Sequence, residues 1–319
     1  MSHKTKVVTL LIALVAWLGV AAYGYTQTDA AKTNLTRVVI GYQKADPVDI
    51  ARQHGELAKK MKAKGYKVVF KEFQNGVALL TALKAGNINY ARLGDTPPVV
   101  NQAAGLDLVY VAAGGSKVKG TAVLVKKNSN IKSMADLRGK RIAYAKGTTA
   151  QFMMVQALGT ANLTVNDATL VDMDQSAASV AFAKGNVDAW VTWPPYTETA
   201  EVEQGAKILL DATGLAKDRD FFVSTRKYAK KNTDVSALLV SYLSSDMDWA
   251  NANHDKLITM LAKTLHLSKT IVKRMIDRRH FSMGKVTPSI LAEQQKIADV
   301  FYEQGLIEKK IKVSDAMLK

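Results

Sequence analysis

Short β-rich runs alternate with helical runs along this chain, and the alternation restricts its fold more than any other feature. The first passage predicts strands at residues 38–40, 67–73, 88–93 and 108–111 and helices at residues 48–64, 77–85 and 97–104. Gly65, Gly86 and Gly105 follow the three helices and are typical helix stops. This order predicts an α/β fold with a mostly parallel sheet that helices cover on both faces.

A second passage of the same kind follows. It predicts strands at residues 121–125, 141–145, 168–171, 189–193, 208–210 and 221–224 and helices at residues 148–158, 176–184 and 195–204. Ser133 and Asp136 have the spacing of a capping box for a short helix. From Asp234 onward nearly all of the chain is predicted to be helical. We therefore expect two α/β lobes followed by C-terminal helices.

Two stretches are the expected crossings between the lobes, Gly114–Gly120 and about Gly214–Asp220. Because the chain crosses twice, the helical tail has to return to the first lobe. We therefore assign residues 36–115 and 222–319 to lobe 1, and residues 116–221 to lobe 2. The length of 319 residues also fits two domains, at roughly 100–200 residues per domain.

The N-terminal segment has the pattern of a secretory signal peptide. Lys4 and Lys6 precede an apolar run, and the small residues around Ala22 and Gly24 suit a cleavage site. We assign residues 1–24 to this leader and residues 25–35 to a linker. The run is nearly long enough to span a bilayer, so an uncleaved anchor is the alternative. The expected location is the periplasm.

Composition excludes several classes of site. The chain has no cysteine, which rules out disulfide scaffolds, thiolate metal sites and thiol nucleophiles. The formal net charge is +16, and roughly +14 without the leader, so an anionic partner and a merely solvated surface are both open. The lysines are scattered, and the interleaved aromatics of a nucleic-acid surface are missing. We expect no nucleic-acid partner.

The motifs of the common enzyme sites are also missing. The five histidines lack metal-ligand spacing, and the chain has no nucleophile elbow, Walker A loop or dinucleotide-binding fingerprint. Asp172 and Asp174 are close enough to share a cation, but no further acid completes a site. The sequence therefore predicts no catalytic residue, no metal and no cofactor.

Small polar residues follow five of the predicted strands. These strand ends carry Gln43, Gln74-Asn75-Gly76, Gly94-Asp95-Thr96, Lys146-Gly147-Thr148-Thr149 and Trp193-Pro194-Pro195-Tyr196. In open α/β sheets ligands bind beyond the carboxyl ends of the strands, so these segments are expected to converge.

Their chemistry suits the capture of an anion. A helix N-terminus offers unpaired N–H groups and partial positive charge, and the hydroxyls of Thr148 and Thr149 would add donors. Such a site is expected to hold an oxyanion without a paired lysine. Trp193 would form an apolar wall for an alkyl tail. The alternative for each segment alone is an ordinary helix cap.

Four of these motifs together resemble a known family. The sequences GYQK at 41–44, GDTPP at 94–98, KGTT at 146–149 and VDAWVTW at 187–193 resemble the solute-binding proteins of sulfonate, taurine and nitrate ABC importers, and the aliphatic sulfonate branch most. The resemblance covers about residues 36–230. It implies a type II periplasmic binding fold, with two lobes, a two-segment hinge and a ligand in the cleft between them.

The resemblance also implies a function without catalysis. The protein would act as a monomer and deliver a small anionic ligand to an inner-membrane ABC permease. The residues that would line the cleft are Gln43, Asn75, Gly76, Asp95, Thr96, Thr148, Thr149 and Trp193.

One departure from the family pattern bears on the ligand. The family often has Asp after the tryptophan of the last motif, whereas this chain has Pro194. A cleft without that carboxylate offers less to an ammonium group, which favours a plain alkanesulfonate over taurine, although Asp95 could still accept an ammonium. Taurine, nitrate or another small anion is the alternative ligand. An enzyme related to pyrimidine-precursor synthesis and an anchored sensor domain are the alternative functions.

Overall fold

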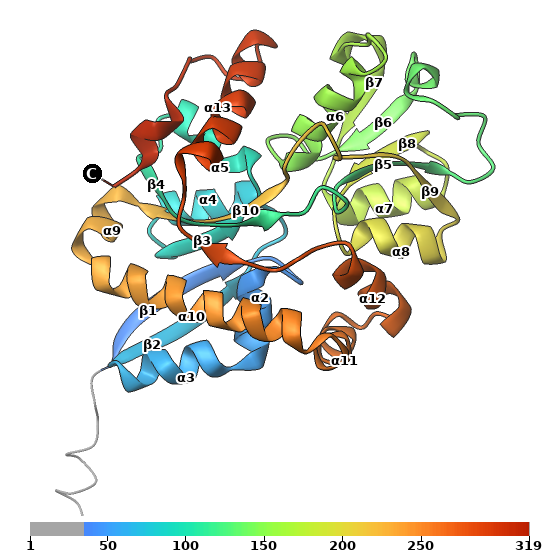
Figure 1. The fold of residues 1–319 in the computed structure, drawn as a ribbon. Helices are drawn as coiled ribbons and strands as arrows, with labels where there is room; N and C mark the ends of the chain where they lie inside the picture. Colours follow the sequence, from blue (N-terminus) through green and yellow to red (C-terminus); the bar gives the residue numbers. More distant parts are fainter. Residues whose placement is uncertain (1–34, 319) are drawn as a thin grey trace, which may run out of the picture.

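The computed structural model describes residues 35–318, and the predicted leader and almost all of the linker lie outside them. The described chain forms two sheets with helices around each (Figure 1). Within it, no helix combines the length and the apolar character needed to cross a bilayer.

The first sheet has six strands in the order β11-β4-β10-β3-β1-β2. Its strands are β1 (Thr36–Tyr42), β2 (Tyr66–Glu72), β3 (Tyr90–Leu93), β4 (Leu108–Ser116), β10 (Arg219–Thr225) and β11 (Met283–Gly284). β1 pairs in parallel with β2 and β3, whereas β10 runs antiparallel to both of its neighbours, β3 and β4. β1 to β4 therefore share one direction, as the alternation of the first passage predicted.

The second sheet repeats this pattern with five strands in the order β7-β6-β8-β5-β9. Its strands are β5 (Ala122–Lys126), β6 (Arg141–Tyr144), β7 (Thr169–Asp172), β8 (Ala189–Thr192) and β9 (Ala206–Asp211). β6 pairs in parallel with β7 and β8, and β5 is antiparallel to β8 and β9. In each sheet the strand that follows a crossing, β10 or β5, thus runs antiparallel to both of its neighbours. At the edge of the first sheet, β11 is also antiparallel to its neighbour β4.

Helices cover both faces of each sheet. Those around the first sheet are α2 (Pro47–His54), α3 (Glu56–Ala63), α4 (Gly76–Lys84), α5 (Thr96–Ala103), α9 (Arg226–Lys231), α10 (Thr233–Ala252), α11 (His254–Leu265), α12 (Lys269–Asp277) and α13 (Pro288–Glu303). Those of the second are α6 (Thr149–Gly159), α7 (Gln175–Ala183) and α8 (Tyr196–Glu203). Short 3₁₀ turns lie at Met134–Leu137, Val165–Asp167 and Val313–Ala316.

The cores follow from alternation along the strands. In β1, Val38 and Ile40 pack into one apolar cluster and Val39 packs into another on the opposite face. In β5, Val123 and Leu124 separate in the same way. Each sheet is therefore buried on both faces, which explains why its strands contain continuous apolar runs.

Local caps set most helix starts. The side chains of Asp46, Asn75 and Asp174 accept from backbone N–H groups in the first turns of α2, α4 and α7. The predicted capping box of Ser133 and Asp136 is present. The single helix predicted at residues 48–64 is wrong, because Gly55 has a left-handed φ of 85° and separates α2 from α3.

Two connections join the sheets, β4 to β5 and β9 to β10, and they run side by side (Figure 1). Lys117 N donates to Lys217 O at 3.2 Å, and Ala212 N donates to Val118 O at 3.0 Å. The expected return to lobe 1 at residue 222 falls inside β10, which begins at Arg219. Beyond it, the C-terminal helices pack mostly on the first sheet, whereas α12 also contacts α8 of the second lobe.

Candidate functional site

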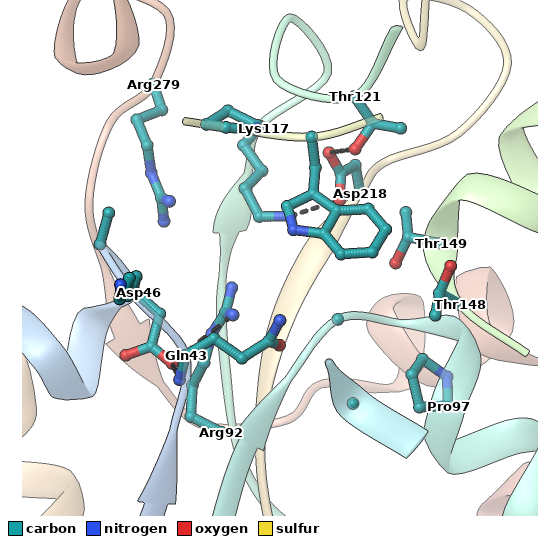
Figure 2. Close-up of a pocket in the computed structure, with 16 residues that line it drawn as sticks. Gln43, Asp46, Arg92, Pro97, Lys117, Thr121, Thr148, Thr149, Asp218 and Arg279 are labelled. Atoms are coloured by element: carbon teal, nitrogen blue, oxygen red, sulfur yellow. Dashed lines mark hydrogen bonds and ion pairs between the residues drawn. The ribbon is translucent and has the colours of Figure 1, made fainter. Parts of the chain in front are cut away.

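A cavity lies between the two lobes and encloses about 600 Å³ of atom-free space, part of it open to solvent (Figure 2). Ends of strands, starts of helices, both crossings and the segment after α12 contribute to it. Its lining residues are Gln43, Lys44, Ala45, Asp46, Gly76, Arg92, Gly94, Pro97, Lys117, Thr121, Thr148, Thr149, Trp193, Pro194, Asp218 and Arg279. The site is therefore assembled from segments that are far apart in the sequence.

Five of the eight residues predicted to bind ligand line this cavity: Gln43, Gly76, Thr148, Thr149 and Trp193. Gln43 follows β1, and Gly76 begins α4. Gly76 has no room for a side chain, because an added Cβ would lie 2.6 Å from Pro97 Cγ. The backbone of the α4 start thus forms part of the cavity wall.

The other three predicted residues are not among the lining residues of the cavity. Asn75 caps α4, and its Oδ1 accepts from Ala78 N at 2.9 Å. This is the ordinary helix cap that was the alternative to a ligand-binding role. Asp95 is 3% exposed and its Oδ1 accepts from the hydroxyls of Thr149 at 2.8 Å and Thr96 at 3.1 Å. Asp95 and Thr96 therefore act next to the cavity, by linking the start of α5 to the start of α6.

The two threonines differ from their expected role as hydroxyl donors. Thr148 donates to Ala145 O at 2.7 Å, and Thr149 donates to Asp95 across the gap between the lobes. A hydroxyl has one proton to give, so neither proton is free for a ligand in this arrangement. Within the first turn of α6, Gln151 N already donates to Thr148 O at 2.9 Å. What α6 offers to an anion is therefore the backbone N–H groups of Thr148 and Thr149 at its start.

The expectation that no dedicated cation lines the site is wrong. Arg92, Lys117 and Arg279 line the cavity, and all three side chains are at most 10% exposed. They converge on Asp220, which contacts Arg92, lies 3.5 Å from Lys117 Nζ and accepts from Arg279 Nη2 at 2.6 Å. One carboxylate is therefore shared by three cations.

Two further carboxylates complete this charge cluster. Asp218 accepts from Lys117 and from the Thr121 hydroxyl, the latter at 2.8 Å. Asp46 caps α2 and lies 3.6 Å from Arg92. Burial raises the pKa of Asp46 to about 6, against the opposing effect of Arg92. When it is protonated, the cations outnumber the ionised carboxylates.

Burial has the opposite effect on the cations. It lowers the pKa of Arg92 and the pKa of Arg279 to about 10, and it lowers the pKa of Lys117. Both guanidinium groups keep their charge at neutral pH. The Nε atoms of Arg92 and Arg279 are buried and have no hydrogen-bond acceptor in the part of the chain that the structure describes. These N–H groups are available to an added acceptor.

The cavity lining also has apolar members. They include Trp193, Pro194 and Pro97. The carboxylate that Pro194 replaces is not the only one that a cleft can use, because Asp46 and Asp218 also line the cavity. Pro194 in place of the family Asp therefore gives less reason to favour a plain alkanesulfonate over taurine than the sequence alone implied.

The charged residues that line the cavity were not identified from the sequence, although some of them had a local sequence pattern that could have indicated their role. Arg92 is a charged residue inside an apolar strand, and Lys117 and Asp218 fall within the predicted crossings, so each carried a local signal. Arg279 carried none, because it belongs to a helical tail with no motif. It enters the cavity from the segment that joins α12 to β11.

Comparisons with known proteins agree with this architecture. The model of the NMT1/THI5-like family matches residues 61–256. A relative from Escherichia coli (strain K12), provisionally named as an aliphatic sulfonates-binding protein, is 34% identical over 305 residues, which cover 95% of this chain and 93% of the relative.

Two crystal structures are similar over most of the chain. The alkanesulfonate-binding protein SsuA of Xanthomonas axonopodis pv. citri, bound to MOPS, has a TM-score of 0.85 and 32% identity, covering 89% of this chain and 98% of that one. The periplasmic aliphatic sulphonate binding protein SsuA of Escherichia coli has a TM-score of 0.81 and 34% identity, with coverages of 89% and 92%. The predicted periplasmic binding fold is confirmed. The chain belongs to the NMT1/THI5-like family and, within it, to the group of aliphatic sulfonate-binding proteins that its four motifs predicted.

Proposed function

We propose that this protein is the solute-binding component of an ABC importer and that it captures a small organosulfonate in the cavity between its lobes. The observation that carries the proposal is that the lining of one cavity combines three cations, Arg92, Lys117 and Arg279, with the apolar side chain of Trp193. An alkanesulfonate combines the complementary groups, an anionic head and an apolar tail.

The relatives give the proposal its biological setting. The three relatives described above are named as sulfonate-binding proteins, and one is named as periplasmic. We infer that this protein is exported to the periplasm, binds its ligand as a monomer without transforming it, and passes it to an inner-membrane permease.

Within the cavity, the sulfonate would lie between the start of α6 and the cations. Gln43 and the backbone N–H groups at Thr148 and Thr149 would donate to its oxygens. Hydrogen bonds to a charged group contribute about 1.5–3 kcal/mol each, so a few of them suffice for micromolar affinity. The tail would lie against Trp193, where apolar burial contributes about 0.8 kcal/mol per methylene.

A thermal-shift panel tests the proposal. The panel compares ethanesulfonate, pentane-1-sulfonate, taurine, sulfate and nitrate at constant ionic strength. Ligand at 100 times its dissociation constant should stabilise the folded protein by about 2.7 kcal/mol. Stabilisation by the sulfonates, without turnover by mass spectrometry, is the expected result. A panel in which no sulfonate shifts the melting temperature would reject the proposal.

The role of Trp193 has its own test. Trp193→Ala should weaken pentane-1-sulfonate by at least tenfold more than ethanesulfonate, because only the longer tail can cover the indole. Isothermal titration calorimetry measures both, and the shorter ligand serves as the internal control for the head group. Equal losses for the two ligands would contradict the tail-wall role of Trp193.

A further inference from the structure

Two consecutive arginines after α12, Arg278 and Arg279, reach into different parts of the molecule. Arg279 lines the cavity, whereas Arg278 contacts α8 of the second lobe. The segment that carries them continues directly into β11, which pairs with β4 of the first sheet. One short piece of backbone anchored to lobe 1 therefore contacts both the proposed ligand site and the opposite lobe.

Arg279 is buried but incompletely paired. Its side chain is 8% exposed, and its Nη2 donates to Asp220 at 2.6 Å. The guanidinium lies 4.4 Å from the centre of the Phe281 ring, which covers one of its faces. Figure 2 shows the side chain pointing into the cavity from the side opposite Arg92. Its Nε is buried and has no hydrogen-bond acceptor among the described residues.

The competing cations are more fully paired. Lys117 is held by Asp218 in addition to Asp220, and Arg92 has Asp46 at 3.6 Å as well as Asp220. Arg279 has Asp220 alone, and shares it with the other two. A planar guanidinium also matches the spacing of two oxygens on one anionic group. Arg279 is thus the cation with the most unused capacity for an anion.

Arg278 makes a different and equally specific contact. Its Nη1 lies 2.9 Å from Glu198 Oε1 and 2.6 Å from Glu201 Oε2, two residues that share a face of α8. The Glu198 side chain is fully buried, and burial raises the pKa of its carboxyl. An ion pair withdrawn from water depends on its geometry and weakens steeply when the partners separate. The contact therefore persists only while α8 of the second lobe stays close to the segment that carries Arg278.

We propose that Arg279 binds the anionic head of the ligand and that its neighbour Arg278 couples this binding to lobe closure through Glu198 and Glu201. The proposal rests on the proposed function and specifies a residue that recognises the ligand and a residue that positions the lobes. A ligand oxygen on Arg279 fixes the 278–279 backbone. That backbone then holds Arg278 against α8, so release of the ligand and opening of the lobes become one event.

The experiment uses pentane-1-sulfonate and stopped-flow measurement of intrinsic tryptophan fluorescence, with four variants. Arg279→Gln should weaken binding at least tenfold, and Arg279→Lys should recover part of that loss because it retains the charge next to Asp220. Arg278→Gln should raise the dissociation rate at least fivefold and leave the association rate within twofold. Arg274→Gln is the matched control, since Arg274 is an exposed residue of α12, the helix that ends just before Arg278. Circular dichroism verifies that each variant is folded.

A double-variant cycle tests the coupling itself. If the two arginines act together, Arg278→Gln should change the dissociation rate much less in the Arg279→Gln background than in the wild type. If Arg279→Gln and Arg279→Lys both bind pentane-1-sulfonate with the affinity of the wild type, the assignment of Arg279 is overturned. Independent, multiplicative effects would overturn the coupling through Arg278. Failure of the wild type to bind any sulfonate would instead reject the proposed function and this inference with it.

Discussion

Gly94 illustrates how one residue can limit the approach of two lobes. A Cβ added at this position would lie 2.4 Å from Thr149 Oγ1, so the bare backbone of the β3 end touches the α6 start. The Thr149 hydroxyl donates to the adjacent Asp95 in the same region. A methyl group would have to displace a short, β-branched side chain that has few alternative rotamers.

Gly94→Ala should therefore weaken sulfonate binding by roughly tenfold, which corresponds to about 1.4 kcal/mol, because the lobes cannot close fully. Isothermal titration calorimetry measures the loss. Gly159→Ala is the control. Gly159 is the last residue of α6, the helix that begins at Thr149, and no atom lies within 4 Å of a Cβ added to it. Wild-type affinity in Gly94→Ala would show that the close approach does not limit closure.

Asp95 makes stability depend on pH in an unusual direction. Burial, with the nearby charge of Asp218, raises the pKa of Asp95 from its ordinary value of 3.8 to about 6. The folded state then holds a proton more tightly than the unfolded state. The stabilisation from that proton is complete below the unfolded pKa and is lost as pH rises through about 6.

Compared with Asp95→Asn, the wild type should lose up to about 3 kcal/mol of unfolding free energy between pH 4 and pH 7. Asparagine keeps an oxygen that accepts from Thr149 and Thr96. Urea denaturation at several pH values measures the difference. Asp174→Asn gives the opposite slope as a control, because hydrogen bonds from Ala177 N and the Ser176 hydroxyl lower the pKa of Asp174. If the wild type instead became more stable relative to Asp95→Asn as pH rises from 4 to 7, the prediction would be contradicted.

At the scale of elements, the sequence predicted what local interactions determine. Strand and helix positions follow from periodicity and from caps such as Asp46, Asn75 and Ser133, whose partners lie within a few residues. The break at Gly55 was missed, because the helical pattern continues on both sides of it. Helix starts around the cavity were predictable for the same local reason.

The cations of the site were not predictable, because their partners are distant in the sequence. Arg279 and Asp220 are 59 residues apart, and Lys117 and Asp218 are 101 apart. No local pattern links such residues, and only the sheet topology and the two crossings bring them together. Strand ends thus indicated where a ligand binds, whereas the charges that meet there required the assembled fold.

Helix α6 connects the two lobes through its apolar face as well as its start. Phe152 is 2% exposed and packs in a cluster of the first lobe with Ile297 and Phe301 of α13, with 6.1 Å between the centres of the two phenylalanine rings. Opening of the lobes would expose this ring. Part of the free energy of closure therefore comes from apolar burial of about 25 cal/mol per Å².

Phe152→Ala should favour the open form. We expect a larger radius of gyration without ligand by small-angle X-ray scattering, and at least tenfold weaker sulfonate binding. Phe182→Ala is the matched control, because Phe182 is equally buried in α7 but packs only within the second lobe, beside Trp190. That variant should lower the melting temperature without opening the molecule. Equal radii for both variants would exclude a role of Phe152 in closure.

The whole molecule depends on how its two crossings are held together. Asp218 on the second crossing accepts from Lys117 and Thr121 on the first, and its side chain is 1% exposed. Since these residues also line the cavity, the hinge and the ligand site share one set of charges. A carboxylate that stabilises the hinge therefore also opposes the approach of an anionic ligand.

Asp218→Asn should separate these two effects. Asparagine tolerates the left-handed φ of 48° at this position and still accepts from Thr121, so the change removes mainly the charge. Removing one of the two buried carboxylates next to Lys117 should lower the unfolding free energy by about 3 kcal/mol. Asp188→Asn, which breaks the exposed pair with Arg141, should cost less than about 1 kcal/mol.

Sulfonate affinity should rise severalfold in Asp218→Asn, because Lys117 gains capacity for the ligand. Chemical denaturation should show the lower stability, and calorimetry should show the higher sulfonate affinity. A loss of both stability and affinity would show that Asp218 supports the site rather than competing with the ligand.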